Sequence, residues 1–113
     1  IYERTTLRPI GETGFTHVDY FHRTAEFGIL IGETDAWGQG YGTEAARQML
    51  QYGFTHLNFH NIWLRVNSSN LRGQRAYTRA GFREAGRLRE AQWIRGQAYD
   101  IIYMECLATE FDV

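Results

Sequence analysis

Two short segments carry residues suited to hold a phosphate-bearing ligand and to move a proton. The first is the glycine-rich run Gly38-Gln39-Gly40-Tyr41-Gly42-Thr43. Glycine lets the backbone adopt positive φ and approach a ligand closely. If a helix begins here, its first amides have no partner within the helix and can bind phosphate oxygens. Taken alone, the run is also compatible with a tight turn that binds nothing.

The second segment is a helical face formed by Asn70, Gly73 and Tyr77. Asn70 and Tyr77 are seven residues apart, so on a helix they share a face and lie about 10 Å apart along the axis. Glycine costs a helix interior about 1 kcal/mol relative to alanine, which indicates that a neighbouring backbone or a ligand arm comes close to Gly73. A tyrosine at this spacing is more often a core aromatic, and its alternative role is that of a proton donor. A separate stripe, suited to phosphate or to solvent, comprises Arg72, Arg75 and Arg79.

The elements that would position these residues alternate between strands and helices. Short β-branched and aromatic runs predict strands, whereas apolar residues at three- and four-residue steps predict helices. The expected strands are Ile1–Arg8, Thr13–Phe21, Ala25–Gly32, Ile62–Val66, Gly86–Arg95 and Ala98–Leu107, and the expected helices are Thr43–Leu57 and Asn70–Ala80. The order strand, loop, helix, strand predicts a βαβ unit with parallel strands.

The composition is that of one folded domain spanning residues 1–113. Apolar residues make up 43% of the chain, which is enough for a core and argues against disorder. No apolar run is long enough to cross a membrane. The single cysteine, Cys106, favours a reducing, cytoplasmic setting and reads as a buried small hydrophobe. No residues have metal-ligand spacing, so no metal site is expected.

Arginine is concentrated in the middle of the chain. Residues 65–95 contain eight Arg and two Glu, whereas residues 96–113 contain four acids and no base. A basic block of this kind fits a nucleic acid, a phosphorylated small molecule or a solvated surface. Nucleic-acid binding ranks last, because aromatic residues are not interleaved with the Arg residues in a recognisable module.

Two common phosphate-binding motifs do not fit the glycine run. A Rossmann loop requires glycine where Thr43 stands, and a P-loop requires lysine, which the chain lacks. The segment 37–42, Trp-Gly-Gln-Gly-Tyr-Gly, instead resembles motif A of the GNAT superfamily of N-acetyltransferases. Its first position is Trp37 rather than Arg or Gln. Residues 37–45 are similar to the branch of ribosomal-protein-alanine and spermidine or polyamine N-acetyltransferases.

The helical face resembles the second signature of the same superfamily, Asn-x-x-Ala/Gly-x-x-x-Tyr-x-x-x-Gly-Phe. Every anchor of that signature is present, and the anchors are Asn70, Gly73, Tyr77, Gly81 and Phe82. The resemblance implies that Asn70 hydrogen-bonds the pantetheine arm of coenzyme A. It also implies that Tyr77 is the general acid that protonates the departing thiolate. With the tail included, the resemblance covers roughly residues 7–107.

The resemblance implies an α/β (α+β) fold, with a mixed, mostly antiparallel sheet and a central βαβα unit. It implies transfer of an acetyl group from acetyl-CoA to a primary amine, on a small molecule or a peptide, without a metal. The strand Ala25–Gly32 and the next one are expected to splay apart. The implied cofactor-binding residues are Leu30, Ile31, Trp37, Gly38, Gln39, Gly40, Tyr41, Gly42, Thr43, Asn70, Gly73 and Arg75.

The general base is open at this point. Glu26 and Glu33 flank the expected strand Ala25–Gly32, and each is either a proton acceptor or a solvated surface charge. The acceptor is also open among polyamines, aminoglycosides, amino acids and protein amino termini.

The family's usual amino-terminal strand and two helices are expected to be missing, because Ile1 already opens the second strand. An uncovered sheet surface and an open edge favour association, so a homodimer is expected. The alternative function is a non-catalytic coenzyme A-binding module or a truncated, inactive acetyltransferase.

Overall fold

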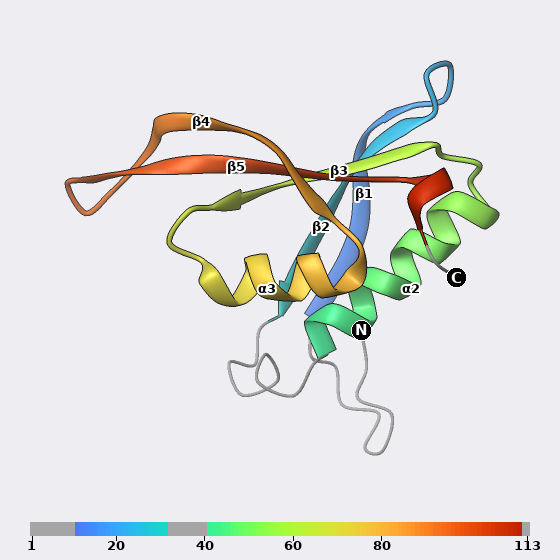
Figure 1. The fold of residues 1–113 in the computed structure, drawn as a ribbon, viewed down its shortest axis with the longest axis horizontal. Helices are drawn as coiled ribbons and strands as arrows, with labels where there is room; N and C mark the ends of the chain where they lie inside the picture. Colours follow the sequence, from blue (N-terminus) through green and yellow to red (C-terminus); the bar gives the residue numbers. More distant parts are fainter. Residues whose placement is uncertain (1–10, 32–40, 112–113) are drawn as a thin grey trace.

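The computed structural model describes residues 11–31 and 41–111, which form one mixed sheet and two helices (Figure 1). The strands are β1 (Gly11–Asp19), β2 (Thr24–Ile31), β3 (Asn61–Asn67), β4 (Arg83–Ile94) and β5 (Gln97–Leu107), in the order β1-β2-β3-β5-β4. The helices are α2 (Tyr41–Thr55) and α3 (Leu71–Ala80), and a 3-10 turn, η1 (Ala108–Glu110), follows β5. Only the β2–β3 pairing is parallel, which confirms the expected fold class. The strand expected at Ile1–Arg8 lies outside the described residues.

Strands β1 and β2 form a hairpin whose turn is fixed by Asp19. One carboxylate oxygen of Asp19 accepts hydrogen bonds from the backbone amides of Phe21 and His22, both at 3.0 Å. This is the local bonding that makes Asp a common turn residue. The pairing of the two strands shifts register between Thr16 and Asp19, and His17 has φ 49° there. A bulge of this kind re-aims side chains, and here it re-aims that of His17.

Helix α2 connects β2 to β3 and completes the expected βαβ unit. It begins at Tyr41, two residues earlier than expected, so Gly42 is helical rather than part of the loop. The predicted apolar stripe is confirmed, since Ala46 and Leu50 are fully buried. At Gly53 the helix is so close to the sheet that an added Cβ would lie 2.7 Å from Ile62 Cδ1.

Helix α3 begins at Leu71, one residue after the expected start at Asn70, and ends at Ala80 as predicted. The Asn70 side chain caps its start by accepting a hydrogen bond from the Gly73 amide at 2.9 Å. Gly81 ends it with φ 125°, a conformation that favours glycine. Helix α2 ends at Thr55, two residues before the expected end at Leu57.

Strands β4 and β5 form the long hairpin that projects from the body in Figure 1. Its two-residue turn, Arg95-Gly96, has positive φ at both positions, as favoured hairpin turns require. Strand β4 begins at Arg83, three residues before the expected start at Gly86. It is exposed along its whole length and forms one edge of the sheet.

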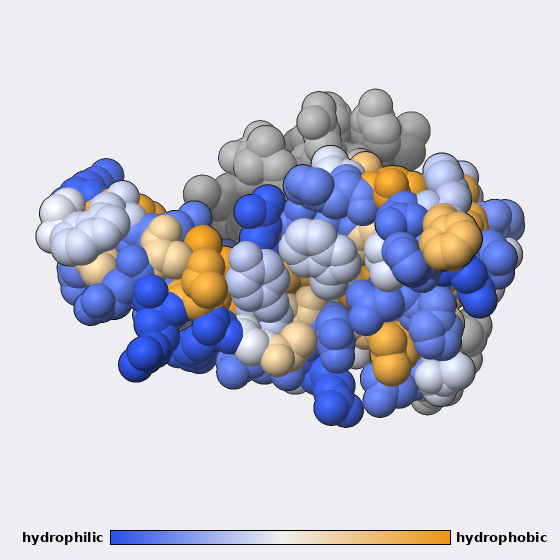
Figure 2. All heavy atoms as spheres, turned by 90° about the horizontal axis from the view of Figure 1, so that it is seen from above, coloured by the Kyte–Doolittle hydropathy of each residue, from blue (hydrophilic) through white to orange (hydrophobic). Residues whose placement is uncertain are grey.

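Both helices cover the same face of the sheet. Buried side chains of α2 and α3 pack with alternate residues of β3 and β5, namely Ile62, Leu64, Val66, Ile102, Met104 and Cys106. The other face carries the intervening residues of these strands, which are partly or fully exposed. In Figure 2 this face shows pale aromatic side chains among hydrophilic ones, with apolar residues only in small separate groups. We call it the open face below.

Candidate functional site

The parallel strands β2 and β3 separate after three pairs. Their register joins Thr24 to Asn61, Ala25 to Ile62 and Glu26 to Trp63, and no later pair is formed between the described residues. Strand β2 nevertheless continues to Ile31 and β3 to Asn67. Beyond Glu26, the backbone groups of β2 and β3 that face each other therefore form no hydrogen bonds between the two strands. Such groups can pair with an extended ligand that carries amides.

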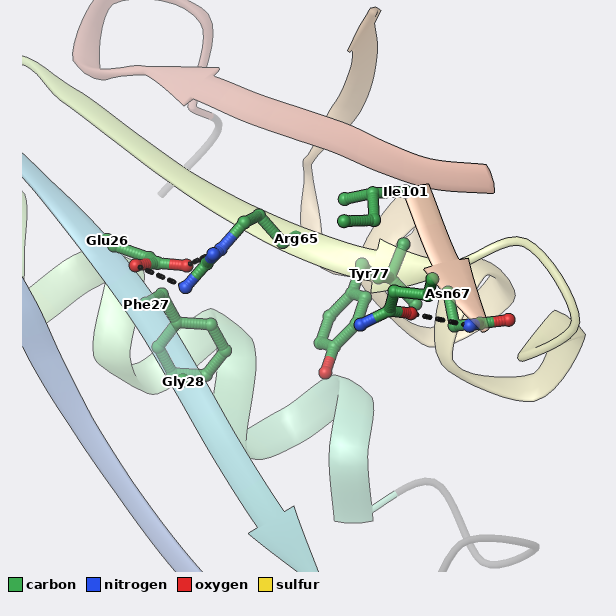
Figure 3. A pocket seen from close by; sticks show the side chains of 9 residues that line it. Glu26, Phe27, Gly28, Arg65, Asn67, Tyr77 and Ile101 are labelled. Carbon is green, nitrogen blue, oxygen red and sulfur yellow. Dashed lines mark hydrogen bonds and ion pairs between the residues drawn. The ribbon is translucent and has the colours of Figure 1, made fainter. Parts of the chain in front are cut away.

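A pocket of about 380 Å³ occupies this opening (Figure 3). The pocket is lined by residues of β2, β3, α3 and the β4–β5 hairpin: Glu26, Phe27, Gly28, Arg65, Val66, Asn67, Tyr77, Gln92 and Ile101. The expected splaying of the two strands is thus observed, and it brings two predicted site residues, Glu26 and Tyr77, into one pocket. The sequence reasoning missed Arg65, Asn67 and Gln92. The polar alternation of β3 is the only signal that pointed to Arg65 and Asn67.

Tyr77 is held in the opening by two neighbouring rings. Its ring meets those of Phe27 and Phe82 edge-on, at centroid distances of 6.4 and 6.0 Å. Only 8% of the residue is exposed, and burial raises the pKa of its hydroxyl to about 12. The hydroxyl has no hydrogen-bond partner among residues 11–31 and 41–111, and in Figure 3 it points away from the Glu26–Arg65 pair. It is therefore a protonated donor free to act on a ligand.

Glu26 is a buried carboxylate and not the solvated surface charge that was one of its two expected roles. It is 6% exposed. Its oxygens contact Arg65 Nε at 2.7 Å and His17 Nδ1 at 2.7 Å, and Thr16 Oγ1 lies 3.4 Å away. The hydrogen bond to Glu26 raises the pKa of Arg65 above its ordinary value. The cluster ties β1, β2 and β3 together where β2 and β3 begin to separate.

Asn70 and Arg75 lie outside this pocket, in a neighbouring surface hollow. That hollow, of about 450 Å³, is lined by Ser69, Asn70, Leu71, Arg72 and Arg75 at the start of α3. The side-chain oxygen of Asn70 already accepts the capping hydrogen bond, so the side-chain amide nitrogen is the group left for a ligand. Gly73 is buried beneath this side chain, and an added Cβ would lie 2.6 Å from Asn70 Nδ2. The close neighbour expected at Gly73 is thus the cap of its own helix.

The glycine run is only partly described. Tyr41, Gly42 and Thr43 form the first turn of α2, where helix amides have no intrahelical partner. Thr43 lies beside Arg79 of α3 in a third hollow. Leu30 and Ile31 belong to the part of β2 that has left β3. The other predicted residues, Glu33, Trp37, Gly38, Gln39 and Gly40, lie outside the described residues.

Further features of the described residues bear on function. No group of three His, Cys, Asp or Glu side chains in that part of the chain could hold a metal ion. Neither α2 nor α3 combines the length and the apolar character needed to span a bilayer. Cys106 is buried, as expected, and burial raises the pKa of its thiol to about 11.

Comparison with known proteins identifies the family. The family described as the acetyltransferase (GNAT) domain matches residues 1–83. The chain belongs to the GNAT acetyltransferase family. An N-acetyltransferase of Bacillus licheniformis named p20, itself uncharacterized, is 30% identical over 98% of this chain and 62% of its own length. Spermidine N(1)-acetyltransferase of Vibrio cholerae is 34% identical over 90% of this chain and 58% of its own length.

Solved structures of this family share the fold. A spermidine N-acetyltransferase of Vibrio cholerae, solved in complex with CoA and spermine, superimposes with a TM-score of 0.82. It is 35% identical, and the match covers 89% of this chain and 59% of that one. The chain therefore spans about three fifths of the length of these relatives.

Proposed function

We propose that this protein transfers the acetyl group of acetyl-CoA to a primary amine. The observation that carries the proposal is the opening between β2 and β3, which has Tyr77 as a buried hydroxyl donor. An extended pantetheine arm can pair with the backbone groups of Phe27–Ile31 that face away from β1, while the first amides of α2 bind the diphosphate. Asn70, Gly73 and Arg75 are the proposed contacts along α3, with Trp37 to Thr43 as the diphosphate loop.

The proposed reaction is direct attack of a neutral amine on the thioester carbonyl. The new carbon–nitrogen bond forms, the carbon–sulfur bond breaks, and the nitrogen loses a proton to a base or to water. A backbone amide of β2 beyond Glu26 stabilises the carbonyl oxygen as it becomes negative. Glu26 and Glu33 are the proposed proton acceptors. Glu26 would have to release its contacts with Arg65 and His17 before it could accept a proton.

The pKa of Tyr77 defines what its hydroxyl can do. A phenol with a pKa of about 12 keeps its proton at every physiological pH, so the donor is always present. An ordinary thiol has a pKa near 8.5, so complete transfer to a solvated thiolate would be uphill by roughly 5 kcal/mol. The opening also removes water from the sulfur, which raises the pKa of the thiol and reduces the difference between the pKa values of the thiol and Tyr77. Tyr77 is therefore proposed to stabilise the charge on sulfur first and to pass its proton as the thiolate leaves.

The test is a panel of amines with acetyl-CoA, followed by release of free thiol, on the wild-type protein and Tyr77→Phe. We expect turnover by the wild type and a kcat lower by roughly 100-fold or more in Tyr77→Phe, the usual contribution of a positioned acid. Equal rates near neutral pH would remove Tyr77 from the mechanism. Acetyl-CoA binding without turnover of any amine would favour the rival function, a non-catalytic coenzyme A-binding module.

The setting and assembly of the protein are also proposals. We propose a cytoplasmic protein that acts on a small-molecule or peptide amine and not on nucleic acid. We also propose a homodimer, for which the exposed edge strand β4 offers a surface with three exposed apolar residues, Leu88, Trp93 and Ile94. Sizing with light scattering tests this, and a monomer at high concentration would contradict it.

A further inference from the structure

We propose that Trp63, with Glu105 and Tyr103 beside it, binds a second, non-reacting ammonium group of a diamine or polyamine acceptor. The site lies on the open face, next to the opening between β2 and β3. The inference rests on the proposed acetyl transfer and adds the substrate class and the residues that select it.

The register of the sheet places Trp63 between two carboxylates. Trp63 is paired with Glu26 on β2 and with Glu105 on β5. Its strand neighbours Ile62 and Leu64 are buried against the helices, so Trp63 faces the other way. Directly paired residues on one face of a sheet have Cβ atoms roughly 5 Å apart. The indole ring is thus flanked by an acid on each side.

Aromatic rings extend this row across the open face. The ring of Tyr103 lies 6.1 Å from that of Trp63, centroid to centroid, and the imidazole of His17 lies 6.0 Å away on the other side. The faces of Trp and Tyr attract cations through their ring quadrupoles, and Trp does so most strongly. Partly exposed rings beside a carboxylate therefore form a surface suited to an ammonium group.

The two carboxylates differ in their charge balance. Glu26 is neutralised by Arg65. Glu105 accepts a long hydrogen bond of 3.4 Å from Asn61 Nδ2, and no cationic side chain in the described ranges forms an ion pair with it. Its cross-strand neighbour on β4, Arg83, forms its ion pair with Glu110 instead. A protonated amine beside Trp63 could therefore pair with Glu105. A neutral or anionic acceptor would gain nothing from this site.

The distance from the reaction centre suits a molecule with two amino groups. Arg65 lines the opening, and Trp63 lies two residues before it on the same strand, roughly 7 Å away along β3. A short methylene spacer bridges that distance. The first nitrogen of a diamine can then reach the thioester while the second, still protonated, lies over Trp63. A monoamine can use only the first position.

The experiment compares spermidine with propylamine as acceptors. We expect Glu105→Gln and Trp63→Phe to lower kcat/KM for spermidine by roughly three- to tenfold and to leave propylamine within about twofold, since exposed cation–π and ion-pair contacts have modest strength. Trp63→Ala should give a larger loss. Glu90→Gln, on the exposed strand β4, is the matched control and should leave kcat/KM unchanged for both amines.

Calorimetry with spermidine and with acetyl-CoA separates this inference from the proposed function. Weaker spermidine binding by Glu105→Gln, with acetyl-CoA binding unchanged, supports the site. The site would be refuted if the ratio of kcat/KM for spermidine to kcat/KM for propylamine were the same in wild type, Glu105→Gln and Trp63→Phe. Wild-type protein that binds acetyl-CoA but not spermidine would also refute it. Loss of acetyl-CoA binding by the folded wild type would instead refute the proposed function itself.

Discussion

The substitution Tyr77→Phe should change the pH dependence of stability in a way that the structure specifies. It keeps the ring that packs against Phe27 and Phe82 and removes only the buried hydroxyl. That hydroxyl has no partner among the described residues, so its removal leaves none of their polar groups unsatisfied. At pH 8 we expect the free energy of unfolding to stay within about 1 kcal/mol of wild type.

Above pH 10 the two proteins should diverge. The pKa of the Tyr77 hydroxyl is about 12 in the folded chain and 10.0 at its ordinary value. Between these values the folded state binds more protons than the unfolded state, so stability falls as pH rises. The contribution is complete below pH 10, and about 1.4 kcal/mol of it is lost by pH 11, since each unit of pKa difference corresponds to that amount. The total loss by pH 12 is at most roughly 2.7 kcal/mol.

Urea unfolding followed by far-UV circular dichroism, between pH 8 and pH 11, measures this difference. Wild type should lose about 1.4 kcal/mol more than Tyr77→Phe by pH 11. Burial also raises the pKa of Cys106 to about 11, but that thiol is present in both proteins and cancels. Tyr20→Phe is the matched control, because Tyr20 is 72% exposed. Parallel losses in wild type and Tyr77→Phe would show that the Tyr77 hydroxyl is not buried as described.

Three further predictions concern the framework of the site. Gly53→Ala should lower the free energy of unfolding by about 1–3 kcal/mol in urea titrations, because the new Cβ would overlap Ile62 Cδ1. The cost of this overlap should exceed the gain in helix propensity. Asn70→Ser keeps a capping oxygen, so thermal stability should hardly change, whereas calorimetry should show weaker coenzyme A binding through loss of the amide nitrogen. Arg65→Met should lower the free energy of unfolding by about 1–3 kcal/mol, because Glu26 loses its partner while the 49% exposure of the Arg65 side chain limits the effect. The double variant with Glu26→Gln should regain part of this stability.

The elements of the fold followed from local signals. The apolar stripe of α2, the capping Asn70 and the terminal Gly81 each act within one or two helical turns, and both helices form where the sequence predicts them. The boundary errors are equally local. The expected start of α2 at Thr43 is two residues late, because the helix begins at Tyr41.

The composition of the site did not follow from local signals. The partner of Glu26 is Arg65, 39 residues later in the chain, and the two meet only because β2 and β3 are parallel neighbours. Trp63 and Glu105 are likewise joined by the register of β3 and β5. Sequence spacing fixes which residues share a helix face, but cross-strand partners depend on the strand order and register, which a single sequence does not state.

The contacts of Glu26 also bear on which group removes the proton of the amine. Its Oε1 contacts His17 Nδ1, and its Oε2 accepts from Arg65 Nε, both at 2.7 Å, so the favourable acceptor positions of this buried carboxylate are already occupied. Accepting a substrate proton would neutralise the buried Glu26 carboxylate and break its ion pair with Arg65, whose side chain is 49% exposed. Glu26 is thus better suited to hold β1, β2 and β3 in register at the opening than to exchange protons. The amine must then lose its proton to water or to another acceptor, and among the proposed residues that leaves Glu33.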